Sequence, residues 1–89
     1  MRAVITVIGK DTVGILAKVA AVCAEHSVNI LEVTQSVLQE LFTMIMLVDI
    51  SKSTIPFNEL KDQFMNAGEN MGLRILVMHE DIFNSMHKI

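Results

Sequence analysis

Few side chains in this sequence are of the types that carry out covalent chemistry. The single cysteine, Cys23, is followed three residues later by His26, and such a pair would suit a nucleophile and its base. Both residues lie in an alanine-rich segment with helical periodicity, and Cys23 is far from the helix N-terminus that would lower its pKa. We therefore interpret Cys23 as a small buried hydrophobic residue, and a single cysteine forms no intramolecular disulfide.

A second group of polar side chains follows the last predicted strand. His79, Glu80 and Asp81 are adjacent in the sequence and are all potential metal ligands. The three histidines form no close His-x-His or His-x-x-x-His pair, and there is no cysteine pair. We expect the group to be solvated at a strand end. We predict no metal site, no cofactor and no catalytic residue.

The composition limits the classes of function. Of the 89 residues, 52% are hydrophobic and 4% aromatic, and the net charge is −3. An acidic chain without clustered Lys and Arg does not suit nucleic acid, and Phe42 is the only aromatic residue on a predicted strand, so base stacking is not expected. No apolar run reaches membrane-spanning length and no signal peptide is recognised, so we expect no membrane partner and a cytoplasmic location.

The remaining candidate is the turn from Gly9 to Ile15, between a predicted strand and a predicted helix. Gly14 is costly in a first helical turn, and close approach by a ligand or by another backbone would explain it. The N–H groups of a helix N-terminus attract a carboxylate, and Asp11 can meet an ammonium group. The turn therefore suits a zwitterion such as an amino acid. Equally, it is a plain helix start that Asp11 or Thr12 caps.

Hydrophobic periodicity predicts the elements around this turn. They are strand, helix, strand, strand, helix and strand, followed by a helical tail, at residues 2–8, 13–26, 28–38, 41–50, 56–71, 73–79 and 80–89. This is the order of the ferredoxin-like βαββαβ fold, an α+β sandwich whose antiparallel four-stranded sheet carries both helices on one face. We assign residues 1–79 to one domain and residues 80–89 to an amphipathic tail that packs on the domain or on a partner subunit.

The third predicted strand is apolar on both faces. Its alternate residues form two sets, which are Phe42, Met44, Met46, Val48 and Ile50 on one face and Leu41, Ile45 and Leu47 on the other. Helices on one face of the sheet leave the second set to be covered by the tail or by a partner. We expect self-association through the sheet edges, the open face or both.

Two short motifs follow the first strand and open the second, namely Asp11-x-x-Gly14-Ile15-Leu16 and Val28-Asn29-Ile30. Together with the element order they resemble an ACT domain over residues 2–79. This sequence has Thr12-Val13 where the family commonly has Arg-Pro. Residues 35–44 and 82–86 further resemble the stand-alone ACT proteins of bacteria and archaea, whose function is uncharacterised.

The resemblance implies a regulatory module and not an enzyme. It implies a homodimer or higher oligomer, with an effector site where the first loop of one subunit faces the second strand of its neighbour. The ligand-binding residues implied for this chain are Asp11, Thr12, Val13, Gly14, Ile15, Asn29 and Ile30. The implied partners are a small effector, expected to be an amino acid, and a separate metabolic enzyme or regulator. A ligand-free interaction module with the same fold and a small enzyme with its site at the subunit interface stay open as alternatives.

Overall fold

The computed structural model describes residues 1–10 and 14–86. The elements are β1 (Arg2–Lys10), α1 (Ile15–Glu25), β2 (Asn29–Leu38), β3 (Leu41–Asp49), α2 (Phe57–Asn70), β4 (Arg74–His79) and α3 (Glu80–Met86). This order confirms the predicted fold with its C-terminal helix. None of the helices in the described part of the chain is long and apolar enough to cross a membrane.

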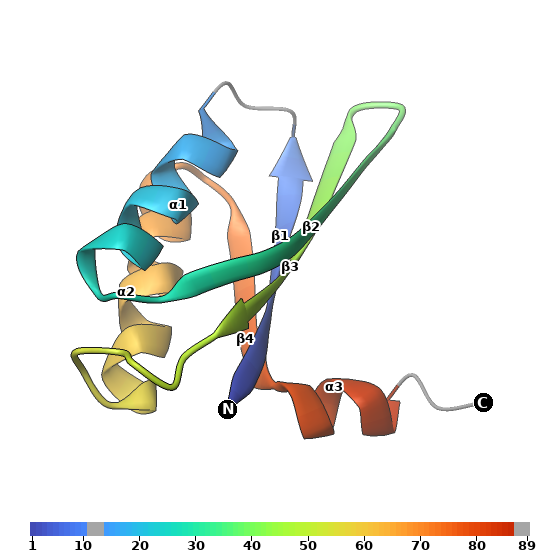
Figure 1. Ribbon diagram of the computed structural model, residues 1–89. Helices are drawn as coiled ribbons and strands as arrows, with labels where there is room; N and C mark the ends of the chain where they lie inside the picture. Colours follow the sequence, from blue (N-terminus) through green and yellow to red (C-terminus); the bar gives the residue numbers. More distant parts are fainter. Residues whose placement is uncertain (11–13, 87–89) are drawn as a thin grey trace.

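The four strands form one antiparallel sheet in the order β2-β3-β1-β4. The central strands are β3 and β1, and the edges are β2 and β4. Both α1 and α2 lie on the same face of this sheet, while α3 runs out on the opposite side (Figure 1). The predicted ferredoxin-like arrangement, with two helices on one face, is therefore confirmed.

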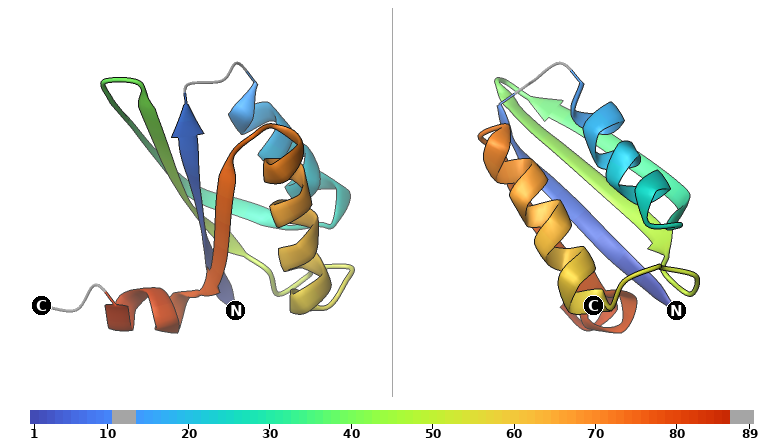
Figure 2. Two further views of the ribbon diagram at one scale, coloured as in Figure 1. Left: turned by 180° about the vertical axis from the view of Figure 1, so that it is seen from behind. Right: turned by 90° about the vertical axis from the view of Figure 1, so that its left-hand side faces the viewer.

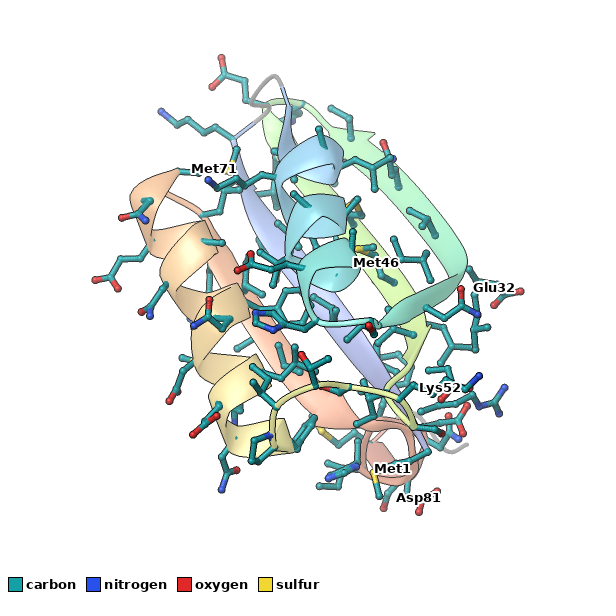
Figure 3. All side chains as sticks on the ribbon, turned by 60° about the vertical axis from the view of Figure 1, so that its left-hand side comes forward. Met1, Glu32, Met46, Lys52, Met71 and Asp81 are labelled. Carbon is teal, nitrogen blue, oxygen red and sulfur yellow. The ribbon has the colours of Figure 1, made fainter. Side chains whose placement is uncertain are left out.

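The hydrophobic core lies between the two long helices and the sheet. Alternate residues of β1 and β3 point into it, and six of them have 0% exposure: Ala3, Ile5, Val7, Met44, Met46 and Val48. Val19 of α1 and Phe64 of α2, also 0% exposed, cover them from above. In Figure 3, Met46 lies between α1 and the sheet. The two central strands, β1 and β3, therefore each offer an apolar face to the helices.

Cys23 belongs to this core, with 1% of its surface exposed. Burial raises the pKa of the Cys23 thiol to about 11, because removal from water disfavours the thiolate. The interpretation of Cys23 as a small buried hydrophobic residue is confirmed.

Both long helices end in the same way, in a turn that leads straight into a strand. After α1, Ser27 takes a left-handed φ of 58°, and the Val28 N–H donates to the Cys23 carbonyl at 2.8 Å. After α2, Gly72 takes a left-handed φ of 71°, and the Leu73 N–H donates to the Gly68 carbonyl at 2.8 Å. These caps satisfy the last carbonyls of each helix and set where β2 and β4 begin.

The predicted helix starts were wrong at two positions. Gly14 is not in the first turn of α1 but is its N-cap, with φ 85° and ψ 10°. Apart from its chain neighbours, no described residue lies within 4 Å of the position that a Cβ on Gly14 would take. The left-handed backbone at Gly14 is by itself sufficient to favour a glycine at this position. Pro56 likewise precedes α2 as its N-cap, with an extended ψ of 155° that keeps it out of the helix.

Candidate functional site

The predicted ligand-binding residues that the structure describes fall into two pairs, which lie near opposite ends of helix α1. Gly14 and Ile15 are at the start of α1, and Asn29 and Ile30 are at the start of β2. The 11 residues of α1 separate the two pairs, a distance of about 16 Å along the helix axis. Figure 1 shows the chain descending through α1 before it turns into β2. A site that holds both pairs therefore needs two chains.

The exposure of these residues differs. Gly14 and Asn29 are exposed, Ile30 is half-buried against the core, and Ile15 is 3% exposed within it. Ile15 therefore belongs to the core and Ile30 packs against it, while Gly14 and Asn29 are accessible at the surface of the single chain. The other three predicted residues, Asp11, Thr12 and Val13, lie outside the described residues.

A polar pocket surrounds Asn29. It has a volume of about 200 Å³ and is lined by Ser27, Asn29, Asp49, Ser51 and Lys52. The α1 cap supplies Ser27, and the register of the sheet sets Asn29 directly opposite Asp49 at the ends of β2 and β3. Lys52 comes from the loop that follows β3. The pocket therefore combines one acidic group, one basic group, an amide and two hydroxyls.

Asp49 is held in its ionised form by hydrogen bonds. The side-chain hydrogen bond from Ser51 lowers the pKa of Asp49 most, and the Ser51 backbone N–H, which donates to Asp49 Oδ1 at 2.9 Å, lowers it further. The N-terminal ammonium group of Met1 lies 3.9 Å from the same oxygen. Figure 3 shows Met1 and Lys52 at one end of the molecule and Met71 at the other. A fixed carboxylate beside a lysine suits a ligand that carries both charges.

A second hollow lies at the other end of β2. It has a volume of about 440 Å³ and is lined by Lys10, Val37, Gln39 and Glu40. Lys10 ends β1, where the turn toward Gly14 begins, and Gln39 and Glu40 form the turn between β2 and β3. The two hollows thus lie at the two ends of the same edge strand, one beside Asn29 and one beside the predicted ligand-binding turn.

The sequence did not single out the residues around Asn29. Ser27, Ser51 and Lys52 belong to connections between elements, and Asp49 lies near the end of a predicted strand. The pairing of β2 with β3 brings them together, and no local pattern signals that register. The one usable signal is the placement of Asp49 and Lys52 around Ile50-Ser51, directly after an apolar strand.

The residues with nucleophilic or metal-binding chemistry have other roles in the structure. His26 Nδ1 lies 3.3 Å from the Thr54 hydroxyl oxygen, and Cys23 is buried. The His79 ring packs on Phe57 with ring centroids 4.2 Å apart. Glu80 forms an ion pair with Arg2 at 2.7 Å. Among residues 1–10 and 14–86, no three His, Cys, Asp or Glu side chains gather where they would hold a metal ion.

The outer edge of β2 is open. All of its residues except Ile30 are exposed, including Val33 at 38% and Val37 at 56%. A bulge lies between Ile30 and Glu32, and Glu32 is the only charged residue of the strand. A long edge strand without Lys or Pro is available for pairing with another strand.

Comparisons with known proteins agree with this architecture. The ACT domain family matches residues 2–79, so the match ends directly before α3. A UPF0237 protein of Clostridium perfringens is 52% identical over 89 residues, covering 100% of both chains. The structure of an ACT domain protein from Streptococcus pneumoniae is 38% identical, covers 93% of both chains and has a TM-score of 0.81.

The same fold also occurs inside longer proteins. A formyltetrahydrofolate deformylase from Pseudomonas syringae matches 88% of this chain with 27% of its own, at 21% identity and a TM-score of 0.78. That identity shows a common fold alone. The family match over residues 2–79 shows more: the chain belongs to the ACT domain family of ligand-binding regulatory modules.

Proposed function

We propose that this chain is a regulatory module that binds a small zwitterion, such as an amino acid, between two copies paired through β2. The observation that carries the proposal is the polar pocket at Asn29, where Asp49 and Lys52 offer both signs of charge within about 200 Å³. A ligand ammonium group would meet Asp49, and a ligand carboxylate would meet Lys52.

Antiparallel pairing of two β2 edges gives a specific register. Centred on Gln35, it sets Val33 opposite Val37 of the partner subunit, on the face of the sheet that carries the helices. Both valines are exposed in the single chain. An apolar pair directly across two strands stabilises such pairing by roughly 0.2–1 kcal/mol and occurs twice about the two-fold axis. The pairing starts beyond the bulge, which involves only the first residues of the strand.

The same pairing joins the two hollows. Because the strands run in opposite directions, the start of β2 in one chain lies beside the hairpin end of the other. The pocket at Asn29 then faces the hollow of the partner subunit, with its Lys10 and the start of its β1–α1 turn. Small-molecule sites usually enclose about 300–1,000 Å³. One hollow of about 200 Å³ falls below this range, and joined to one of about 440 Å³ it lies within it.

Regulation follows from a site shared by two chains. A ligand held by both subunits binds the pair more tightly than the single chain, so it shifts the population toward the pair. A separate enzyme or regulator that recognises the paired form would then respond to the ligand concentration.

A thermal-shift panel of the twenty amino acids at millimolar concentration tests the proposal. A ligand at 100 times its Kd stabilises the folded state by about 2.7 kcal/mol, which is well resolved as a rise in Tm. We expect Asn29→Ala and Lys52→Ala to abolish the rise. The matched controls Asn66→Ala and Lys18→Ala, at exposed positions on α2 and α1, should keep it. Absence of a rise with all twenty amino acids would contradict amino-acid binding.

The exposed helix α3 favours a second candidate, a ligand-free interaction module. Ile82 is 52% and Met86 66% exposed, which suits contact with another protein. A pull-down from the native cell that recovers one stable partner, unaffected by Asn29→Ala but lost on Ile82→Glu, would favour this function over ligand sensing.

A further inference from the structure

The sheet face that the helices leave uncovered is largely apolar. Seven residues form its centre, and we call them the open face: Val4, Thr6, Ile8, Ile45, Leu47, Leu76 and Met78. Six of the seven are apolar, and all but Val4 keep part of their surface exposed. An antiparallel sheet that faces water usually alternates apolar and polar residues, with the polar set outward. This sheet does not alternate in that way.

Helix α3 stands up from one end of the open face. Figure 2 shows it side-on in one view and nearly end-on in the other, so its axis runs away from the sheet. Its 7 residues span about 10 Å, which is also the usual spacing between two packed sheets. None of its residues, all of which are described, is buried. Within the described chain, α3 contacts β1 and β4, and Glu80 at its start pairs with Arg2. Its outer side chains remain exposed.

The opposite end of the open face carries the hairpin between β2 and β3. Figure 1 shows the hairpin tip on the same side of the sheet as α3, at the far end of the strands. Its apolar side chains are also uncovered, with Leu38 at 74% and Leu41 at 49% exposure. The open face is therefore bounded at both ends by exposed apolar side chains, those of α3 and those of the hairpin.

We propose that a second copy of this chain packs its open face on the first, about a two-fold axis that crosses the strands. This axis places the hairpin of each chain against α3 of the other, so that Ile82 and Met86 cover Leu38 and Leu41 of the partner subunit. A two-fold contact is self-complementary, and the two exposed apolar groups are each other's match only in this orientation.

The charges at the two ends select the same orientation. Arg74, exposed and paired with Ile8 across the sheet, lies at the hairpin end, and Asp81, exposed, lies at the start of α3. An axis across the strands brings Arg74 near Asp81 of the partner subunit. An axis along the strands would instead bring Arg74 to the same end as Arg74 of the partner subunit and Asp81 to the same end as Asp81 of the partner subunit. Charge pairs of this kind set orientation more than affinity.

The area is sufficient for a stable contact. Four strands at about 4.8 Å spacing and a β1 of nine residues at about 3.4 Å each give a face of roughly 600 Å² in projection. A standard interface buries about 800 Å² on each partner, and α3 with the hairpin supplies the remainder. This axis lies in the sheet plane and the β2-edge axis is perpendicular to it. The two contacts together therefore generate a closed assembly of four chains.

Light scattering of the full chain after size exclusion, at micromolar concentration, tests the contact. We expect the wild type at four times its mass of 9.9 kDa and the double variant Ile82→Glu/Met86→Glu at twice that mass. Both positions are exposed in the single chain, so the variant should fold, which circular dichroism checks. The control Met65→Glu, exposed at 44% on α2, should keep the wild-type mass.

A charge swap tests the orientation. Arg74→Glu and Asp81→Arg should each reduce the assembly to two chains, and the two together should restore four. Arg74 and Asp81 of one chain lie at opposite ends of β4, roughly 20 Å apart, so a rescue within one chain would not occur. Failure of the swap to restore the assembly would overturn the orientation proposed.

The failures of the two proposals are distinguishable. Val37→Glu at the β2 edge should remove the amino-acid thermal shift, whereas Ile82→Glu/Met86→Glu should leave it. An unchanged mass in the α3 variant overturns the open-face contact, whatever the ligand result. If no amino acid shifts the Tm of the wild type but the α3 variant still has half the wild-type mass, the open-face contact is supported. In that case only the proposed ligand site is contradicted.

Discussion

The two faces of the sheet come from the same strands but have different environments. On the helix-covered face, neighbouring side chains such as Ile5 and Met46 are 0% exposed. On the open face, the adjacent Thr6 and Leu47 are only half-buried, although most of that face is equally apolar. The chain therefore covers one apolar face by itself and carries a second that it does not fully cover. Local sequence pattern distinguishes the two faces only weakly, because both are largely apolar while their coverage differs.

The largest effect is expected on the helix-covered face. Phe64→Ala removes a fully buried ring between α2 and the sheet, and should lower the free energy of unfolding by about 3–5 kcal/mol. Its sequence neighbour Met65 is 44% exposed, so Met65→Ala should change that free energy by less than about 0.5 kcal/mol. Urea denaturation measures both. Equal losses would show that the face assignment of α2 is wrong.

Two neighbours on β3 compare the faces directly. Met46→Ala should destabilise the single chain by about 2–5 kcal/mol, because it leaves a cavity in the core. Leu47→Ala removes a half-buried side chain from the open face, so the loss in a dilute sample should be smaller. At high concentration Leu47→Ala should lose more, because the proposed contact then contributes to stability. Urea denaturation at two protein concentrations separates these cases.

Periodicity was sufficient to predict the element order, because both helices and all strands carry clear apolar spacing. The errors fell where backbone conformation decides a boundary. By their positions in the sequence, Gly14 and Pro56 would start the two helices. The left-handed φ of Gly14 and the extended ψ of Pro56 instead place both residues just before the helices. The pocket at Asn29 was not predicted beyond Asn29 itself. The register between β2 and β3 brings Asp49 to this pocket, and the loop after β3 brings Lys52. Neither a strand register nor a loop conformation follows from hydrophobic periodicity.

Thiol chemistry provides a smaller but sharper test of the covered face. With the pKa of Cys23 at about 11, very little thiolate is present at pH 8, so reaction with a thiol reagent should be at least roughly 100-fold slower than in urea. A cysteine introduced on the open face, Ile45→Cys with Cys23→Ser, should react faster than Cys23 when the protein is dilute. Equal reaction rates for the two cysteines would show that the two faces do not differ in solvent access.

The same shift makes stability depend on alkaline pH. The folded chain holds the Cys23 proton more tightly than the unfolded chain, whose thiol pKa is about 8.5. The resulting stability is complete below that value and is lost as the pH rises toward 11. Cys23→Ser should flatten this part of the stability curve, and a curve unchanged by the substitution would contradict it.

The smallest effect is expected from Asp49, at the charged end of the open face. Hydrogen bonds from Ser51 lower the pKa of its carboxyl group below that of an unfolded chain. Asp49 therefore contributes stability above the ordinary aspartate pKa, and that contribution is lost as the pH falls through the lowered value. Asp49→Asn should reduce the acid sensitivity of Tm as the pH falls below the ordinary aspartate pKa of about 3.9. Because Asp49 also lines the pocket at Asn29, the same variant should lose any amino-acid thermal shift at pH 7. If the acid sensitivity changes while the ligand shift persists, Asp49 acts in stability alone and the ammonium group of the ligand has another partner.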